Sequence, residues 1–196
     1  MRMKMILNEE FLRIYARQKM QSTITESMEN IKHSSCSGDY DIFLSHSSLD
    51  QELTCALYNL FIQNGFNVYL DYEDHELNPQ NITSSTGEQL RNKLKECKCL
   101  AYISTPNIIN SKWCPWELGL FDGISNGKCC ILPIVKQQKD TTYSGQEYLG
   151  MYPYLSYDQI EGSDEGTFWV MDASNPDKYA NLSSWLSGSK LMDHKR

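Results

Sequence analysis

The chain has 196 residues, of which 40% are hydrophobic, 22% are charged and 11% are aromatic. This is the composition of one globular domain that can bury a sizeable core. The formal net charge of -7 argues against nonspecific binding to nucleic acid or to an anionic membrane, because both need a positive protein surface.

The cysteines and histidines do not fit a disulfide framework or a metal site. The seven cysteines are odd in number, and Cys97 and Cys99 join an expected helix end to a strand start, so that their side chains point in different directions. The four histidines have no metal-ligand spacing. We therefore predict free thiols, no metal, and a reducing, cytoplasmic location. No stretch is long and apolar enough to predict a signal peptide or a membrane span.

Residues 7–31 are expected to form an amphipathic helix. Leu7 and Phe11 begin its apolar stripe, and Asn8 followed by two glutamates suits a helix start. This helix either docks on the rest of the domain or pairs with another copy of the chain. Small polar residues follow it, so residues 1–38 are expected to be an N-terminal helix and a linker.

From residue 39 on, the pattern alternates between strands and helices. Short apolar strands are expected at residues 40–44, 66–70, 99–103 and 129–135. Helices are expected at residues 49–63, from 85 or 86 to 97, and at 113–124. The alternation predicts an α/β fold of flavodoxin-like organisation, with a central parallel sheet and helices on both faces, over a core of residues 39–136.

The pattern after residue 136 is less regular. A strand is expected at residues 167–171 and a helix at 176–186, where Tyr179, Leu182 and Trp185 share one side. We expect residues 137–196 to form a C-terminal extension that completes the domain.

Polar and charged residues collect at one edge of the predicted sheet. In an open parallel sheet, ligands bind outside the carboxyl ends of the strands. Those ends are Ser45–Ser48, Asp71–Glu73 and Ser104–Thr105, and the helix of residues 113–124 begins just beyond the third of them. Four segments are therefore expected to converge on one crevice.

Glu117 lies among residues that are expected to face the core. The apolar residues of its helix that recur at helical spacing are Trp113, Trp116, Leu120, Phe121 and Ile124. A charged side chain on this stripe is costly without partners, which makes Glu117 a candidate for chemistry. The alternative is a helix-end glutamate that reaches solvent or caps a loop.

Several segments resemble those of Toll/interleukin-1 receptor (TIR) domains, in the same order along the chain. They are Tyr40–Asp50, Gly65–Asp71, Ser111–Gly119 with its Trp-x-x-x-Glu pattern, and Cys130–Val135. The loop from Tyr72 to Thr83 resembles the BB loop of the family, although it is longer and more polar than in several catalytic relatives, and Pro115 shifts where the following helix begins. The resemblance spans residues 39 to about 135 and implies a flavodoxin-like TIR fold.

Within the family, the chain resembles the bacterial branch that cleaves NAD, and in particular the TIR proteins of the Thoeris antiphage-defence system. The glutamate of Trp-x-x-x-Glu is essential in that branch, which implies that Glu117 is catalytic. The resemblance implies substrate contacts for Phe43, Leu44, Ser45, His46, Asp71, Leu77 and Trp113. The alternative for Phe43 and Trp113 is a plain core position, and for His46 it is a simple surface position.

The resemblance implies an NAD+ glycohydrolase or cyclase for which NAD+ is the substrate and no cofactor is needed. Its product would be a cyclic ADP-ribose isomer or an ADP-ribose conjugate that activates a separate effector, and self-association through TIR–TIR contacts is expected. The alternative is a non-enzymatic adaptor that assembles through such contacts. A flavodoxin-like nucleotide binder is a weaker third possibility, because no glycine-rich loop follows the first strand.

Overall fold

The computed structural model describes residues 6–19, 39–70, 84–125, 128–136, 147–159 and 166–194. The strands are β1 (Leu7–Asn8), β2 (Tyr40–Ser45), β3 (Val68–Tyr69), β4 (Cys97–Ser104), β5 (Cys129–Val135), β6 (Tyr154–Gln159), β7 (Gly166–Met171), β8 (Lys178–Asn181) and β9 (Met192–Asp193). The helices are α1 (Glu9–Lys19), α3 (Gln51–Gln63), α4 (Ser84–Lys95), α5 (Trp113–Ser125) and α6 (Leu182–Leu186). Short 3-10 turns are η1 (Ser48–Asp50), η3 (Ile108–Asn110) and η4 (Glu147–Met151).

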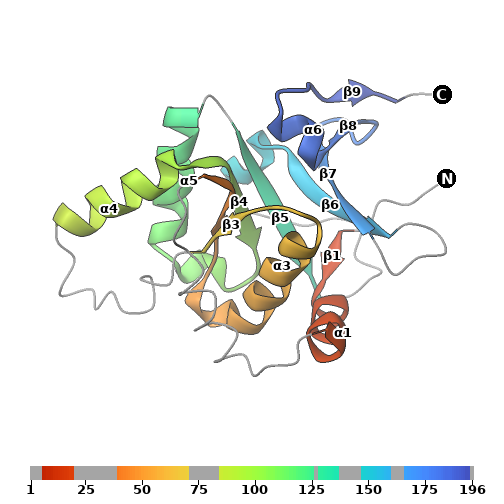
Figure 1. The fold of residues 1–196 in the computed structure, drawn as a ribbon, viewed down its shortest axis with the longest axis horizontal. Helices are drawn as coiled ribbons and strands as arrows, with labels where there is room; N and C mark the ends of the chain where they lie inside the picture. Colours follow the sequence, from red (N-terminus) through yellow and green to blue (C-terminus); the bar gives the residue numbers. More distant parts are fainter. Residues whose placement is uncertain are drawn as a thin grey trace.

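The described strands form one sheet of nine, in the order β3-β2-β4-β5-β6-β7-β8-β9, with β1 paired to β5 off this path (Figure 1). Strands β3, β2, β4 and β5 are parallel, as predicted for the core of the domain. Strand β6 joins β5 in parallel at Tyr154 and Ile131, and β6 to β9 then pair antiparallel. The C-terminal extension therefore continues the same sheet.

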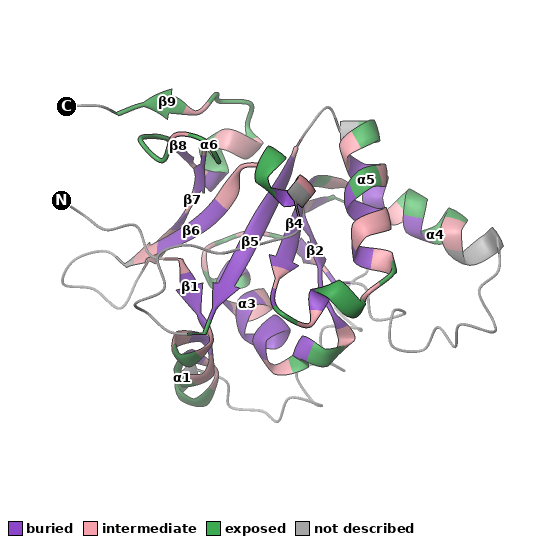
Figure 2. Ribbon diagram, turned by 180° about the vertical axis from the view of Figure 1, so that it is seen from behind, coloured by how far each residue is buried: buried purple, intermediate pink, exposed green. Residues whose placement is uncertain are grey.

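The two faces of the sheet carry two core clusters. Ile42 and Leu44 of β2 belong to the cluster under α1, α3 and α6, while Phe43 belongs to the cluster under α4 and α5. This alternation follows from the period of two residues along a strand. Figure 2 shows the central strands buried between helices whose outer surfaces are exposed, so the predicted covering of both faces is confirmed.

The N-terminal helix docks on the domain. The predicted helix start at residue 7 is wrong: Leu7 and Asn8 pair in parallel with the end of β5, so α1 begins at Glu9. The Phe11 backbone N–H donates to Asn8 Oδ1 at 2.8 Å, which is the N-cap bond expected of an asparagine at a helix start. Leu12 is fully buried in the cluster shared with α3. The part of the predicted helix beyond Lys19 lies outside the described residues.

The C-terminal extension differs from its prediction at one element. Strand β7 matches the expected strand, but residues 178–181 of the expected helix form β8, and only Leu182–Leu186 are helical. Ala180 pairs with Val170 of β7, so sheet pairing outweighs the helical spacing of the aromatic residues. The Asn181 side chain accepts a bond from the Ser183 N–H at 3.0 Å and starts α6 at that point.

Candidate active site

Helix α5 places Glu117 on its buried face. Glu117 is 3% exposed, and Cys114, Leu118 and Phe121 are buried with it. These positions follow the i, i+3, i+4, i+7 spacing of one helix face, so the predicted burial of Glu117 is confirmed. The predicted stripe is wrong at Ile124, which is 43% exposed, because the core cluster under α5 extends only as far as Phe121.

The start of α5 is fixed by local contacts. The Cys114 backbone N–H donates to Ser111 Oγ at 3.2 Å, which caps the first turn. Pro115 lies in this turn, where a backbone N–H would have no helical acceptor, so the proline is tolerated. The helix thus begins at the carboxyl edge of the sheet with Glu117 one turn further in.

Glu117 contacts the end of β2. Ser45 is the last residue of that strand and 1% exposed, and its hydroxyl donates to Glu117 Oε2 at 2.6 Å. This distance is at the short end of the range for a hydrogen bond between a hydroxyl and a carboxyl oxygen. The carboxylate is therefore held at the strand ends, where the sequence predicts the crevice.

Tyr102 lies beside this pair on the neighbouring strand. It faces Ser45 in the register of β2 and β4 and is fully buried. Burial raises the pKa of Tyr102 far above its ordinary value, and the neighbouring Tyr148, Cys114 and Glu117 raise it further. A neutral phenol therefore lies near the carboxylate at ordinary pH. Tyr102 could not be predicted as a site residue from the sequence, where it is only one residue of an apolar strand.

His46 is buried rather than a simple surface residue. It is 3% exposed, and its Nδ1 lies 3.3 Å from the Leu44 carbonyl oxygen. The Cys114 thiol donates to the His46 carbonyl oxygen at 3.0 Å. Cys114 was not among the predicted site residues, although its place three residues before Glu117 puts both on the same helix face.

The other predicted site residues take different positions. Phe43 is buried with its ring 5.4 Å from that of Tyr69, and Leu44 is buried on the opposite face of the sheet. Trp113 is half-buried, and its ring meets the Trp116 ring edge-on at 5.5 Å. Asp71 and Leu77 lie outside the described residues. The described structure thus brings Ser45 into contact with Glu117, with His46 next to Ser45 in the chain and Trp113 one turn before Glu117.

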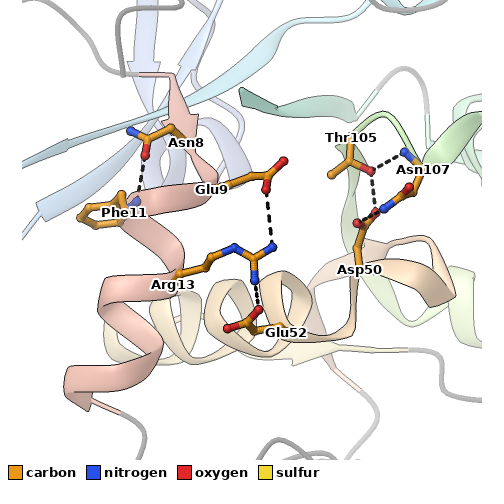
Figure 3. A network of polar contacts seen from close by, with 8 residues as sticks. All are labelled: Asn8, Glu9, Phe11, Arg13, Asp50, Glu52, Thr105 and Asn107. Carbon is orange, nitrogen blue, oxygen red and sulfur yellow. Dashed lines mark hydrogen bonds and ion pairs between the residues drawn. The ribbon is translucent and has the colours of Figure 1, made fainter. Parts of the chain in front are cut away.

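A second polar network ties the two loops of this edge together (Figure 3). The Asp50 carboxylate accepts bonds from Thr105 Oγ1 at 2.5 Å and from Asn107 Nδ2 at 2.6 Å. Asp50 follows β2 and Thr105 follows β4, so the network joins the loops that leave adjacent strands. A hydrogen-bonded network of this kind restrains the segments that carry it, so the two loops are held together at the edge where β2 and β4 end.

A cavity of about 340 Å³ lies at the same edge, between α1, the start of α3 and the turns after β4 and β5. Its lining residues are Glu9, Arg13, Leu49, Asp50, Glu52, Leu53, Pro106, Asn107 and Lys136. Arg13 lies between Glu9 and Glu52 and pairs with both, so its charge is compensated (Figure 3). Neither Ser45 nor Glu117 lines this cavity.

The described ranges contain no group of three histidine, cysteine, aspartate or glutamate side chains arranged to hold a metal ion. Six cysteines fall in these ranges and all six are free thiols. No helix in the described part of the chain is long and apolar enough to cross a membrane.

The sequence matches a known family. The TIR domain family matches residues 42–166, and the chain belongs to this family. A protein of Bacillus cereus (strain MSX-D12) named "Probable 3' cyclic ADP-D-ribose synthase ThsB'" is 40% identical to it over 148 residues, which are 75% of this chain and 75% of that protein.

Proposed function

We propose that this chain is a TIR-domain enzyme of Thoeris antiphage defence that cleaves the nicotinamide–ribose bond of NAD+ and makes an ADP-ribose-derived signal. Membership of the TIR family supports this proposal, and so does the similarity to a protein named as a cyclic ADP-ribose synthase. The observation that carries it is the buried Glu117 carboxylate, held by the Ser45 hydroxyl at the carboxyl edge of the sheet.

The reaction suits a single acidic residue. Nicotinamide in NAD+ carries a positive charge and leaves as a neutral molecule, so its departure needs no general acid. Positive charge then develops on the ribose ring, as it does in glycoside cleavage. A fixed carboxylate in a water-poor site stabilises such charge better than water does, because it needs no reorganisation during the reaction. We assign this role to Glu117.

The nucleophile that attacks the anomeric carbon of the ribose determines the product. Attack by water gives ADP-ribose, nicotinamide and one proton. Attack by the adenosine half of the same molecule gives a cyclic isomer, and it also releases nicotinamide and one proton. The name of the Bacillus cereus relative specifies a cyclic ADP-ribose, and we therefore propose cyclisation for this chain. Exclusion of water from the bound substrate is the physical requirement for this outcome.

We also propose how the enzyme acts in the cell. NAD+ is its substrate, so no further cofactor is required, and the product activates a separate effector protein. Free thiols at all six described cysteines suit the reducing cytoplasm. Self-association through TIR–TIR contacts is part of the proposal, and sedimentation of the purified chain in the presence of NAD+ measures it.

The test is product analysis by mass spectrometry after incubation of the purified chain with NAD+. We expect nicotinamide together with a product that is one water lighter than ADP-ribose. The Glu117→Gln variant keeps the shape of the side chain and removes its charge, so its rate is expected to fall at least a hundredfold, on the order seen when preorganised charge stabilisation is removed. Glu88→Gln, at an exposed position of α4, is the matched control and is expected to keep full activity.

Two outcomes contradict the proposal. Equal rates for the wild-type chain and Glu117→Gln would exclude the assigned mechanism. Absence of NAD+ cleavage by the assembled chain, together with concentration-dependent assembly, would instead support the adaptor function.

A further inference from the structure

Cys114 joins the first turn of α5 to the loop after β2. Its side chain is fully buried, and its thiol donates to the His46 carbonyl oxygen at 3.0 Å. Its backbone N–H is held by Ser111 Oγ at 3.2 Å, so the residue that makes the contact is itself fixed at the helix start. Neither the TIR pattern in the sequence nor the assigned chemistry gives Cys114 a role.

The Cys114 contact runs beside the contact that holds the acid. His46 directly follows Ser45, and Glu117 lies three residues after Cys114 on the same helix face. The two hydrogen bonds, Cys114 to His46 and Ser45 to Glu117, therefore join the same helix to the same strand end. Each bond restrains the geometry of the other, because Ser45 and His46 are adjacent in the chain and Cys114 and Glu117 are connected by the helical backbone of α5.

The Cys114 thiol gives the His46 carbonyl oxygen a hydrogen-bond donor at the end of the sheet ladder. The strand pairing of β2 with β4 ends at Ser45, so His46 is the first residue beyond the ladder. A buried backbone carbonyl without a donor costs free energy. The thiol is a weak donor, but the cysteine side chain reaches the His46 carbonyl oxygen from α5. It is also apolar enough to be buried in the surrounding core.

We propose that Cys114 is a positioning residue for Glu117, acting through the His46 carbonyl and the Ser45 hydroxyl. Its thiol holds the end of β2 against α5, which sets the place of the Ser45 hydroxyl and so the direction of the Glu117 carboxylate. The catalytic part of this inference rests on the proposed function. The structural part, the restraint of residues 45–48, does not.

The kinetic test compares three variants of the full chain. Cys114→Ala removes the donor, and kcat for NAD+ cleavage is expected to fall about ten- to a hundredfold with KM within about twofold, since misplacement of a reacting group by fractions of an ångström to an ångström has effects on this scale. Cys114→Ser restores a donor and is expected to recover most of the lost kcat. Cys129→Ala is the matched control, because Cys129 is also fully buried and its thiol lies 3.9 Å from the Leu118 carbonyl oxygen of α5, away from β2.

Hydrogen exchange of the backbone amides supplies a readout that does not depend on activity. Cys114→Ala is expected to speed exchange in residues 45–48 relative to Cys129→Ala, after both are corrected for global stability. Equal exchange in these two variants overturns the inference, and so does a Cys114→Ser variant with kcat as low as that of Cys114→Ala. If the wild-type chain cleaves no NAD+, the proposed function fails, and the exchange measurement alone still decides whether Cys114 restrains the strand end.

Discussion

The contact between Ser45 and Glu117 shows how one hydroxyl can serve a buried acid. A carboxylate that leaves water needs hydrogen-bond donors, and the Ser45 hydroxyl supplies one at 2.6 Å. The same bond fixes one carboxylate oxygen and therefore the orientation of the group. The residue at this strand end thus affects both the hydrogen bonding and the orientation of the Glu117 carboxyl group.

Ser45→Ala is expected to lower kcat for NAD+ cleavage about tenfold or more, because the carboxylate loses a charge-assisted hydrogen bond of roughly 1.5–3 kcal/mol. The control is Ser156→Ala in β6, at another fully buried serine, whose hydroxyl has no hydrogen-bond partner within the described part of the chain. Ser156→Ala is expected to keep kcat and to unfold no more easily than the wild type. Steady-state kinetics and denaturant unfolding measure both effects, and equal kcat in the two variants would argue against a role for Ser45.

Sequence patterns predict some site residues better than others. The burial of Glu117 could be predicted, because helical spacing alone places it among apolar neighbours. The partnership with Ser45 follows only from the convergence of strand ends, which the alternation of strands and helices implies. Tyr102 and the Cys114 thiol could not be assigned in advance, because their roles depend on strand register and on a contact between segments 68 residues apart.

At the scale of elements, α1 docks on the sheet through aromatic residues. The Phe11 ring lies 5.9 Å from the Tyr157 ring of β6, and Tyr15 is 9% exposed. The Tyr15 hydroxyl is buried, and it has no hydrogen-bond partner among the residues that the structure describes. Burial, and then the nearby Tyr157, raise the pKa of Tyr15 to about 12.

This raised pKa predicts a loss of stability in alkali. Between pH 10 and pH 12 the unfolded chain releases the Tyr15 proton while the folded chain keeps it, so the free energy of unfolding falls as the pH rises. Tyr15→Phe removes this contribution, which is at most about 1.4 kcal/mol per pH unit. At pH 7 the variant is expected to be as stable as the wild type, or about 1 kcal/mol more stable, because an unpaired buried hydroxyl is removed.

Denaturant unfolding from pH 7 to pH 12 checks this expectation. Tyr152→Phe is a useful comparison, because the pKa of Tyr152 is also raised to about 12 by burial and by Asp122, but its hydroxyl donates to Asp122 at 3.2 Å. The Tyr152 variant is therefore expected to lose stability at pH 7. Identical pH profiles for Tyr15→Phe and the wild type would mean that α1 does not bury this phenol.

Helices and strands could be predicted from the sequence where the hydrophobic pattern extends over many residues. They could not be predicted where it covers only a few. The parallel core strands are continuous apolar runs, which only a sheet covered on both faces accommodates. In contrast, the spacing of Tyr179, Leu182 and Trp185 fits a helix, yet the first of these lies in a strand. Four residues are too few for local preference to compete with pairing to a neighbouring strand.

The domain is larger than the segment that the family pattern covers. The TIR match spans residues 42–166, but fully buried residues also come from before and after it, among them Leu7, Leu12 and Leu182. Strand β5 pairs with β4 on one side, and with β6 and then β1 on the other. The two ends of the chain therefore complete one core.

A chain that begins at residue 39 is expected to be unfolded or strongly destabilised. Loss of Leu7 and Leu12 alone removes two buried leucines, each of which contributes about 2–5 kcal/mol, against a typical total stability of about 5–15 kcal/mol. Circular dichroism and thermal unfolding of the shortened chain measure this directly.

Point variants of α1 supply the control for this truncation. Leu12→Ala is expected to lower the free energy of unfolding by about 2–5 kcal/mol, whereas Ile14→Ala, at a residue 43% exposed on the same helix, is expected to change it by about 0.5 kcal/mol or less. A shortened chain as stable as the full one would show that the N-terminal segment is dispensable.

The pairing of the outermost strands also bears on how copies of this chain can meet. In the described sheet, β1, β3 and β9 each have a single neighbour, and each is two residues long. Short edges give another molecule little main chain with which to build a ladder, which protects against aggregation by strand addition. Self-association of this chain, which is part of the proposed function, is therefore expected to use side-chain contacts, and its geometry can change with a few surface substitutions while the sheet stays intact.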